Sequence, residues 1–406
     1  CRLEEALPIL LRAKRVVIAG DPKQLPPTRF FESAVVESDD TQAETVEELA
    51  VQQMSEAEDL LTAALNLDVD EAFLDVHYRS RNEALIGFSN QNYYNHRLQP
   101  IPGHPKNKAL NTPIILHNIN GTYVDRTNKA EALAVVEHVA ELLEDSNPPS
   151  IGIACFNITQ RDLIVDVLND RCYEDPVFAS RYATQRNRRG RDSFEGLFVR
   201  NLENVQGDER DVIIVSTTFG LDPEGKFRRN FGALSRQGGD RRLNVLVTRA
   251  RSEIHVFTSI PQEEYRSLPA AGEAQTGRQH LYGYLRYAEH LAARFEEYQD
   301  YLESLRAESD ATCTVLESNH PSRLAQELGI HLRDSQHIGS TIHWGNDGFC
   351  IDAALTHPHL PEDVTLGILT DFNRFKKTPD PIAWEHFRTE VLRSQGWHLH
   401  RVWSPM

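Results

Sequence analysis

Short apolar strands alternate with amphipathic helices over the first 305 residues of the chain. The strands carry almost no polar positions, which is typical of strands buried on both faces of a parallel sheet. The helices repeat their apolar positions every three or four residues, as helices packed on such a sheet do. Strands are predicted at residues 15–20, 150–156, 211–217 and 253–259, and helices at 2–14, 38–60, 129–145, 159–171 and 262–305. The pattern predicts a doubly wound α/β domain.

The order of the elements changes near residue 321. A helix is predicted at 322–329, strands at 331–339, 341–355 and 364–372, a second helix at 382–396 and a last strand at 397–403. Helix, three strands, helix, strand is the core order of the restriction-endonuclease-like fold, although the order of elements alone establishes no function.

The composition predicts a soluble protein of the cytoplasm. Hydrophobic residues make up 40% and charged residues 25% of the 406 residues, and no apolar run has the length of a membrane span. The five cysteines are scattered and form no CxxC pair, which argues against a zinc ribbon and a disulfide framework. The histidine pairs at 357/359 and 398/400 have no cysteine or carboxylate at ligand spacing and are interpreted as ordinary surface or strand residues.

Charge complicates the prediction of a partner. The formal net charge is −17, whereas a nucleic-acid interface needs cations. Arginines nevertheless cluster locally, and a protein that slides along a strand can hold phosphates in one groove and remain acidic elsewhere. A solvated charged loop is the alternative interpretation of the first cluster. The candidate strand-binding arginines are Arg186, Arg188 and Arg189 in the first cluster and Arg228 and Arg229 in the second.

The most informative segment is VVIAGDPKQLPPT, residues 16–28. A polar loop that follows the end of a strand is where α/β proteins place ligand-binding residues. The whole segment resembles motif III of superfamily 1 helicases of the up-frameshift type. The resemblance implies that Gly20 and Asp21 line an ATP site and that Gln24 senses the γ-phosphate.

Three further segments resemble motifs IV, V and VI of the same family, in the family's order. HYRSRNEAL, from residue 77, resembles motif IV and implies that Arg79 acts as an arginine finger, a role that suits a planar and permanently charged group. VQGDERDVIIV, from residue 205, resembles motif V, and RRLNVLVTRAR, from residue 241, resembles motif VI. These two imply ATP-binding positions at Gln206, Gly207, Glu209 and Arg249, a second phosphate-contacting arginine at Arg249, and a nucleic-acid contact at Thr248.

The resemblance also implies what should lie outside this sequence. The chain contains no GxxxxGK[ST] phosphate loop and no Walker B acidic pair, the groups that hold ATP and Mg²⁺ in such motors. We expect both upstream of Cys1, in the first half of the motor. The domains implied are the end of RecA-like domain 1 (residues 1–72), RecA-like domain 2 (73–262), a helical connector and linker (263–308) and a restriction-endonuclease-like domain (309–406).

The last hundred residues resemble the very-short-patch-repair branch of the PD-(D/E)xK nucleases. The family holds Mg²⁺ with carboxylates at the ends of adjacent strands. Asp352 and Asp371 occupy two of these positions, but Leu369 stands where the family has a glutamate two residues before the second aspartate. A site that has lost this ligand should bind Mg²⁺ poorly, so the domain is predicted to bind or dock DNA without cutting it.

Three functions therefore remain open on the sequence. The leading one is an ATP-dependent helicase or translocase on DNA or RNA, of which this chain supplies the second half and which alone should be inactive. The second is a metal-dependent nuclease with an accessory motor. The third is a nucleic-acid-binding scaffold without catalysis. The nuclease-like tail favours DNA as the track.

Overall fold

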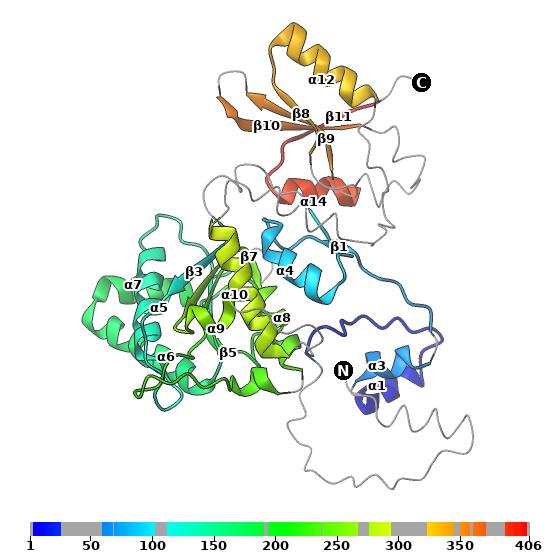
Figure 1. Cartoon of the computed structure of the whole chain (residues 1–406). Coiled ribbons are helices and arrows are strands. Elements are labelled where there is room, and N and C mark those ends of the chain that lie inside the picture. Colours follow the sequence, from blue (N-terminus) through cyan, green and yellow to red (C-terminus); the bar gives the residue numbers. More distant parts are fainter. Residues whose placement is uncertain are drawn as a thin grey trace. The chain divides into compact units, whose positions relative to one another are not determined.

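The computed structural model describes residues 3–25, 59–67, 69–101, 112–190, 194–236, 238–266, 276–293, 323–344, 350–357, 360–370 and 386–403 (Figure 1). The chain divides into two compact units, Cys1–Leu74 (unit 1) and Asp75–Met406 (unit 2). Residues 38–58 of the predicted acidic helix lie outside the described residues. None of the described helices is both long enough and apolar enough to cross a membrane.

Unit 1 contains the helices α1 (Leu3–Leu10) and α3 (Leu60–Leu65). The side chain of Asp59 caps α3 by accepting a hydrogen bond from the backbone N–H of Thr62 at 2.8 Å. The prediction of a strand at residues 15–20 is wrong, because this segment has no regular structure and the side chain of Val17 is 96% exposed. A strand needs a neighbour for its backbone groups, and the described part of unit 1 contains no other strand.

A five-stranded parallel sheet forms the centre of unit 2, which confirms the predicted parallel α/β fold. All five residues of its strand β4 (Ile151–Cys155) are buried, as in a strand covered on both faces. A separate parallel pair joins β1 (Val76–His77) to β2 (Gln99–Pro100). The order across the large sheet is β3 (Ile114–Asn118), β7 (Ala250–Thr258), β6 (Arg210–Ser216), β4 (Ile151–Cys155) and β5 (Phe198–Asn201).

Helices cover both faces of this sheet, because successive side chains of each strand point to opposite faces. On β7, Phe257 packs into one core, whereas Ile254 and Val256 pack into the other. The first core also receives α5 (Lys129–Leu142), α6 (Ile158–Glu174) and α7 (Pro176–Arg186). The second core receives α4 (Ala84–Tyr93), the 3₁₀ helix η2 (Gly232–Ser235), α8 (Gly239–Val247), α9 (Gln262–Arg266) and α10 (Gly277–Ala293).

The C-terminal part of unit 2 has its own four-stranded sheet, in the order β11-β10-β9-β8. The strands β10 and β11 are parallel, and the other two pairs are antiparallel. The elements follow one another as helix, three strands, helix, strand, in the predicted order. They are α12 (Arg323–Gln336), β8 (Ser340–Trp344), β9 (Ile351–His357), β10 (Leu360–Thr370), α14 (Arg388–Ser394) and β11 (Leu399–Val402).

Two predicted boundaries in this part are wrong. The segment 331–339 was expected to be a strand, but α12 continues to Gln336 and ends at His337, whose φ of +56° is left-handed. The N–H of Ile338 then donates to the carbonyl of Leu332 at 3.1 Å, which closes the helix end. The single strand expected at 341–355 is instead the two antiparallel strands β8 and β9.

Candidate functional site

Residues from the three segments that resemble motifs IV, V and VI meet at the amino ends of β6 and β7. Glu209 immediately precedes β6 and Arg249 immediately precedes β7. The strands are paired with Arg210 opposite Ala250, and the N–H of Arg210 donates to the carbonyl of Arg249 at 3.2 Å. The register of the sheet therefore brings Glu209 and Arg249 to neighbouring positions.

Arg79 joins this group from a segment more than a hundred residues earlier. Its Nε donates to Oε2 of Glu209 at 2.5 Å, and its Nη1 donates to the carbonyl of Thr248 at 3.2 Å. Nε of Arg251 donates to the other carboxylate oxygen of Glu209 at 3.2 Å. We call Arg79, Glu209, Arg249 and Arg251 the arginine cluster.

The arginine cluster holds three arginines and one carboxylate, and Nη1 of Arg251 also donates to Oε1 of Glu195 at 2.7 Å. Burial opposes ionisation of Glu209, but the hydrogen bond and charge of Arg79, helped by Arg251, lower the pKa of this carboxyl. Arg249 is only 4% exposed, and burial together with the charge of Arg79 lowers the pKa of its guanidinium to about 10. His77 is kept neutral, because burial and Arg79 lower its pKa to about 3. Because the charge of Arg79 disfavours the charged form of Arg249, an anion that contacts both guanidinium groups would be stabilised there.

The remaining predicted site residues of this part of unit 2 lie in the loop before β6, where the resemblance implies ATP contacts, and at the end of α8, where it implies a nucleic-acid contact. Gly207 has a φ of +91°, a conformation that glycine adopts without strain, and a Cβ there would meet nothing within 4 Å. Gln206 beside it is exposed. Thr248, the predicted nucleic-acid contact, is buried, and its hydroxyl donates to the carbonyls of Asn244 and Val245 at 2.9 and 3.0 Å.

The residues that resemble motif III lie in unit 1. Nε2 of Gln24 donates to Oδ2 of Asp21 at 2.9 Å, and the N–H of Lys23 donates to Oδ1 of Asp21 at the same distance. A Cβ on Gly20 would lie 2.9 Å from Cδ2 of Leu61, so only glycine fits there without movement of that leucine. The loop is therefore hydrogen-bonded internally, and Asp21 holds the side-chain amide of Gln24 in place.

The first predicted strand-binding group lies where α7 ends. Arg186 is in the last turn of α7 and its guanidinium lies 5.9 Å from the ring centre of Tyr182. Arg188 donates to the carbonyl of Pro148 at 2.5 Å. Arg189 lies in an isolated bridge with Phe194.

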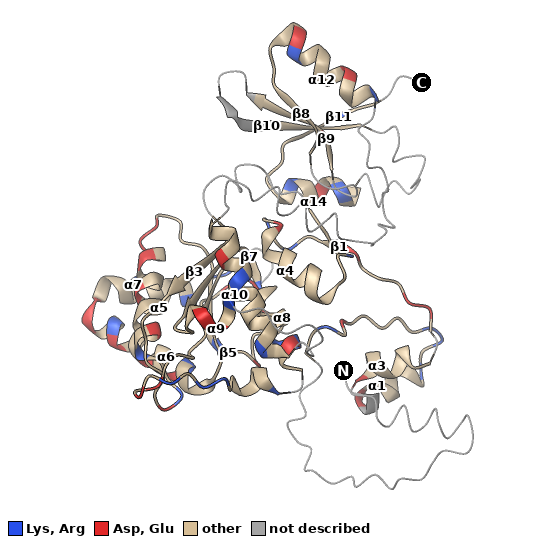
Figure 2. Ribbon diagram, in the orientation of Figure 1, with Lys and Arg blue, Asp and Glu red and all other residues tan. Residues whose placement is uncertain are grey.

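The second predicted group lies in the loop between β6 and η2. Arg228 is 75% exposed and 3.4 Å from Asp222, and Arg229 makes a two-point contact with Glu264 at 2.7 and 3.1 Å. Among the described residues, no recorded contact joins these two arginines to the first group. Figure 2 shows that Asp and Glu accompany the Lys and Arg residues of unit 2.

In the tail, the structure describes one of the two predicted metal ligands. Asp352 on β9 is buried, and its Oδ2 accepts from the N–H of Thr370 at 2.7 Å and lies 3.9 Å from Nη2 of the buried Arg388. Leu369 is 2% exposed and packs in a core cluster with Trp397 and Leu392. Asp371 lies outside the described residues. The position of the expected glutamate is thus filled by core packing, and a cation from the protein already accompanies Asp352.

A buried hydrogen-bond network, not predicted from the sequence, surrounds the Glu131 carboxylate at the carboxyl end of β6. Its Oε2 accepts from the hydroxyl of Ser216 and from the N–H of Thr218, both at 2.7 Å. Glu131 is fully buried, and burial raises the pKa of this carboxyl to about 7 although the hydrogen bonds oppose the rise. The sequence gives no signal for it, because the residue looks like any acidic residue in the first turn of a helix. A cluster of three histidines, His117, His138 and His255, was not predicted from the sequence either.

Comparison with known proteins gives three findings. Residues 52–260 match the AAA domain family. An uncharacterized ATP-dependent helicase of Mycoplasma genitalium, MG140, is 31% identical over 404 residues, and its homolog in Mycoplasma pneumoniae is 29% identical over 412. Both alignments cover 99% of this chain and 34% of the relative. The C-terminal domain of a possible DNA helicase from Lactobacillus plantarum is 16% identical, with a TM-score of 0.25 over 45% of this chain and 86% of that chain.

The chain thus spans about a third of the length of these curated relatives. The family match covers just over half of it and contains the arginine cluster of unit 2. The chain belongs to the AAA domain family.

Proposed function

We propose that this chain supplies the second half of the ATP site of a helicase or translocase. The observation that carries the proposal is the arginine cluster: Arg79 contacts Glu209 and Thr248 and lies close enough to Arg249 to lower its pKa. Two adjacent guanidiniums that repel each other in the absence of an anion are suited to the charge that develops on a transferring phosphoryl group.

Each residue of the arginine cluster has a separate proposed role. Arg79 and Arg249 contact the phosphates, and Glu209 holds Arg79 until nucleotide is present. Once Arg79 turns to a phosphate, the Glu209 carboxylate becomes an acceptor for a ribose hydroxyl. The resemblance to motif III makes Gln24, whose Nε2 donates to Asp21, the proposed γ-phosphate sensor. ATP supplies the transferring group, and its Mg²⁺ would be held by a phosphate loop and Walker B acids, which this sequence lacks.

The division of the site between two chain segments gives a direct test. The 406-residue chain alone should hydrolyse no ATP, with or without single-stranded DNA. A longer protein that joins it to a phosphate loop should show nucleic-acid-stimulated hydrolysis in the same phosphate-release assay. Turnover by the 406-residue chain at a rate similar to that of the longer protein would refute the proposal.

We propose single-stranded DNA as the track and RNA as the second candidate. Arg186, Arg188 and Arg189, with Arg228 and Arg229, are the proposed phosphate contacts. The exposure of Arg228 supports this assignment, because a phosphate can reach its guanidinium. Arg229 must exchange Glu264 for a phosphate, so it should contribute less.

Salt dependence of binding measures these contacts. Binding of single-stranded DNA should weaken as salt rises, and Arg228→Gln should reduce the log–log slope by about 0.7, the value for one phosphate contact. The measurement is fluorescence anisotropy of a labelled oligonucleotide over a range of KCl concentrations. Arg266→Gln is the matched control, because Arg266 is 55% exposed and is likewise paired with a carboxylate, that of Glu289, but belongs to neither arginine group. Equal slopes for all three proteins would remove Arg228 from the interface.

For the C-terminal sheet we propose a DNA-docking function without cleavage. Arg388 and the Thr370 N–H already interact with Asp352, and Leu369 is part of the core. Replacing a metal ligand by an apolar side chain removes both charge and coordination. Cleavage of duplex DNA by the chain in Mg²⁺ that Asp352→Ala abolishes would instead establish the nuclease function.

A further inference from the structure

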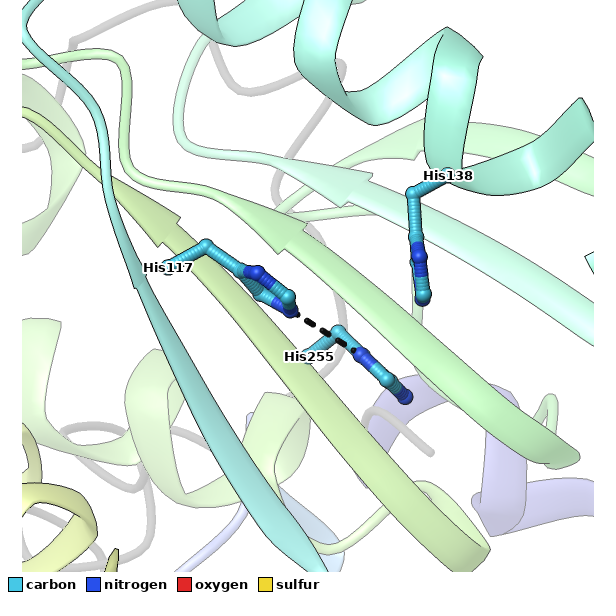
Figure 3. Close-up of side chains that lie close together, drawn as sticks. All are labelled: His117, His138 and His255. Atoms are coloured by element: carbon cyan, nitrogen blue, oxygen red, sulfur yellow. Dashed lines mark hydrogen bonds between the residues drawn. The ribbon is translucent and has the colours of Figure 1, made fainter. Parts of the chain in front are cut away.

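Three histidines from three different elements converge beside the edge strand of the large sheet. His117 lies on β3, His255 on β7 and His138 on α5, and Figure 3 shows their rings directed toward one another. One ring nitrogen of each lies within 4.8 Å of a ring nitrogen of the other two. Nε2 of His117 is 3.1 Å from Nδ1 of His255.

The sheet register accounts for this convergence. His117 is opposite Phe257, and Ile115 is opposite His255, in the parallel pair of β3 and β7. Opposed residues share a face, and so do residues two apart on one strand. His117, His255 and Phe257 therefore lie on the same face, the face that α5 covers, and the ring of His117 stacks on Phe257 at 4.2 Å between centroids.

Two carboxylates orient the rings from the outside. Nδ1 of His138 lies 3.0 Å from Oε2 of Glu141, and Nε2 of His255 lies 3.2 Å from Oε2 of Glu253. Histidines that bind metal usually hold their second nitrogen in such a contact, which fixes the tautomer and makes the free nitrogen a better ligand. The contacts leave Nε2 of His138 and Nδ1 of His255 on the inner side of the cluster.

One of these nitrogens has no partner in the protein. Nε2 of His138 is buried and makes no hydrogen bond, although the His138 side chain as a whole is 14% exposed. A buried polar atom without a partner costs free energy. A metal ion on the inner side of the cluster would give this nitrogen a partner. Neutral imidazoles have a free lone pair for a metal.

We propose that His117, His138 and His255 bind one divalent metal ion of the kind that prefers imidazole, with Zn²⁺ as the first candidate. Zn–N bonds of about 2.0–2.1 Å place ligand nitrogens of a tetrahedral site roughly 3.3 Å apart. The His117–His255 separation of 3.1 Å is close to this value, and the His138 nitrogen, which lies within 4.8 Å of the other two, would have to move toward the ion. Three protein ligands leave a fourth position for solvent or an anion.

The ion would tie the edge strand β3 to β7 and α5. None of its ligands belongs to the arginine cluster, so the inference does not depend on the proposed function. The ion would stabilise β3, an edge strand that pairs with only one neighbouring strand, β7.

Metal titration of the whole 406-residue chain tests the inference. The chain is stripped with a chelator, and Zn²⁺ is added in competition with a chromophoric chelator. We expect one tightly bound equivalent, a visible spectrum of tetrahedral Co²⁺ when cobalt replaces zinc, and a higher Tm with zinc than without it. No stoichiometric binding, or no change in Tm, would overturn the inference.

Variants assign the binding to these residues. His138→Gln should lose more affinity than the roughly 10- to 100-fold expected for removal of an outer carboxylate, and Glu141→Gln should lose that smaller amount. Glu141 is 66% exposed, so its variant should fold even if His138→Gln does not. His331→Gln, an exposed histidine on α12, is the control and should bind zinc normally. Equal affinity in Glu141→Gln and in a folded His138→Gln would show that the metal sits elsewhere among the seventeen histidines.

Discussion

Replacing Arg249 by alanine should lower kcat for ATP hydrolysis about 10³-fold, the low end of what the loss of an arginine finger costs. The reason is geometric as well as electrostatic. Arg249 is 4% exposed and is fixed by the hydrogen bond from its Nε to the carbonyl of Val245 at 2.8 Å. A cation fixed in advance stabilises the developing phosphoryl charge without reorganisation, and a water molecule in the vacated space cannot do so. The measurement is steady-state hydrolysis by a longer protein that contains a phosphate loop.

Controls separate chemistry from folding. Arg266→Ala removes an arginine that is 55% exposed and paired with Glu289, and it should leave kcat unchanged. Arg249→Lys keeps the charge but not the planar fork, so kcat should recover only in part. Because Arg249 is buried, circular dichroism and Tm must show that each variant is folded. A folded Arg249→Ala protein with near-normal kcat would end the assignment of this arginine to the phosphates.

Glu131→Gln should change how the stability of the chain depends on pH. The pKa of Glu131 is raised to about 7 in the folded protein, from an ordinary value of 4.5. Its protonated form is therefore favoured by folding. The stability it contributes is fully present below about pH 4.5, declines as pH rises, and is lost above about pH 7, a total of about 3 kcal/mol. Glutamine cannot ionise, so this decline should be missing in the variant.

Urea unfolding at several pH values between 5 and 7.5 checks this expectation. The difference in free energy of unfolding between the wild-type chain and Glu131→Gln should fall by about 2 kcal/mol over that range, because part of the total decline lies below pH 5. Glu137→Gln, on the same helix with a side chain that is 62% exposed, should follow the wild-type curve. Parallel curves for all three proteins would mean that Glu131 is not the group that titrates.

Three of the five strands of the large sheet, β4, β6 and β7, were predicted, because each contains a run of mostly apolar residues. The strands β3 and β5 were not predicted, because they are short and end in polar residues. β4 and β7 lie within one or two residues of their predicted positions at one or both ends, since no other element buries such a run so well. The end of α12 was missed because its termination depends on His337 in a left-handed conformation, a position usually marked by glycine. The prediction of a strand at 15–20 was wrong although its apolar pattern is typical of a strand. A strand also needs a hydrogen-bonded neighbour, which a local pattern cannot reveal.

The candidate sites, like the fold, were only partly predictable from the sequence. Arg79, Glu209 and Arg249 could be named from motifs, and the structure brings these three together, whereas Arg251 was not proposed as part of the site and proves to be the second partner of Glu209. The three histidines could not be found from the sequence, because 138 residues separate His117 from His255 and only the register of β3 against β7 makes them neighbours. Spacing along the chain detects ligands from one element, and this set comes from three.

The helix α10 follows the last motif, yet its apolar side chains complete one of the two cores of the large sheet. Leu285 and Ala288 on it are 0% exposed, and Tyr287 donates a hydrogen bond to the carbonyl of Ala84 at 2.8 Å. Anyone who shortens this protein for expression should therefore cut after residue 293 rather than at the end of β7. A chain that ended at β7 would expose a large apolar surface to solvent, and we expect it to aggregate on purification.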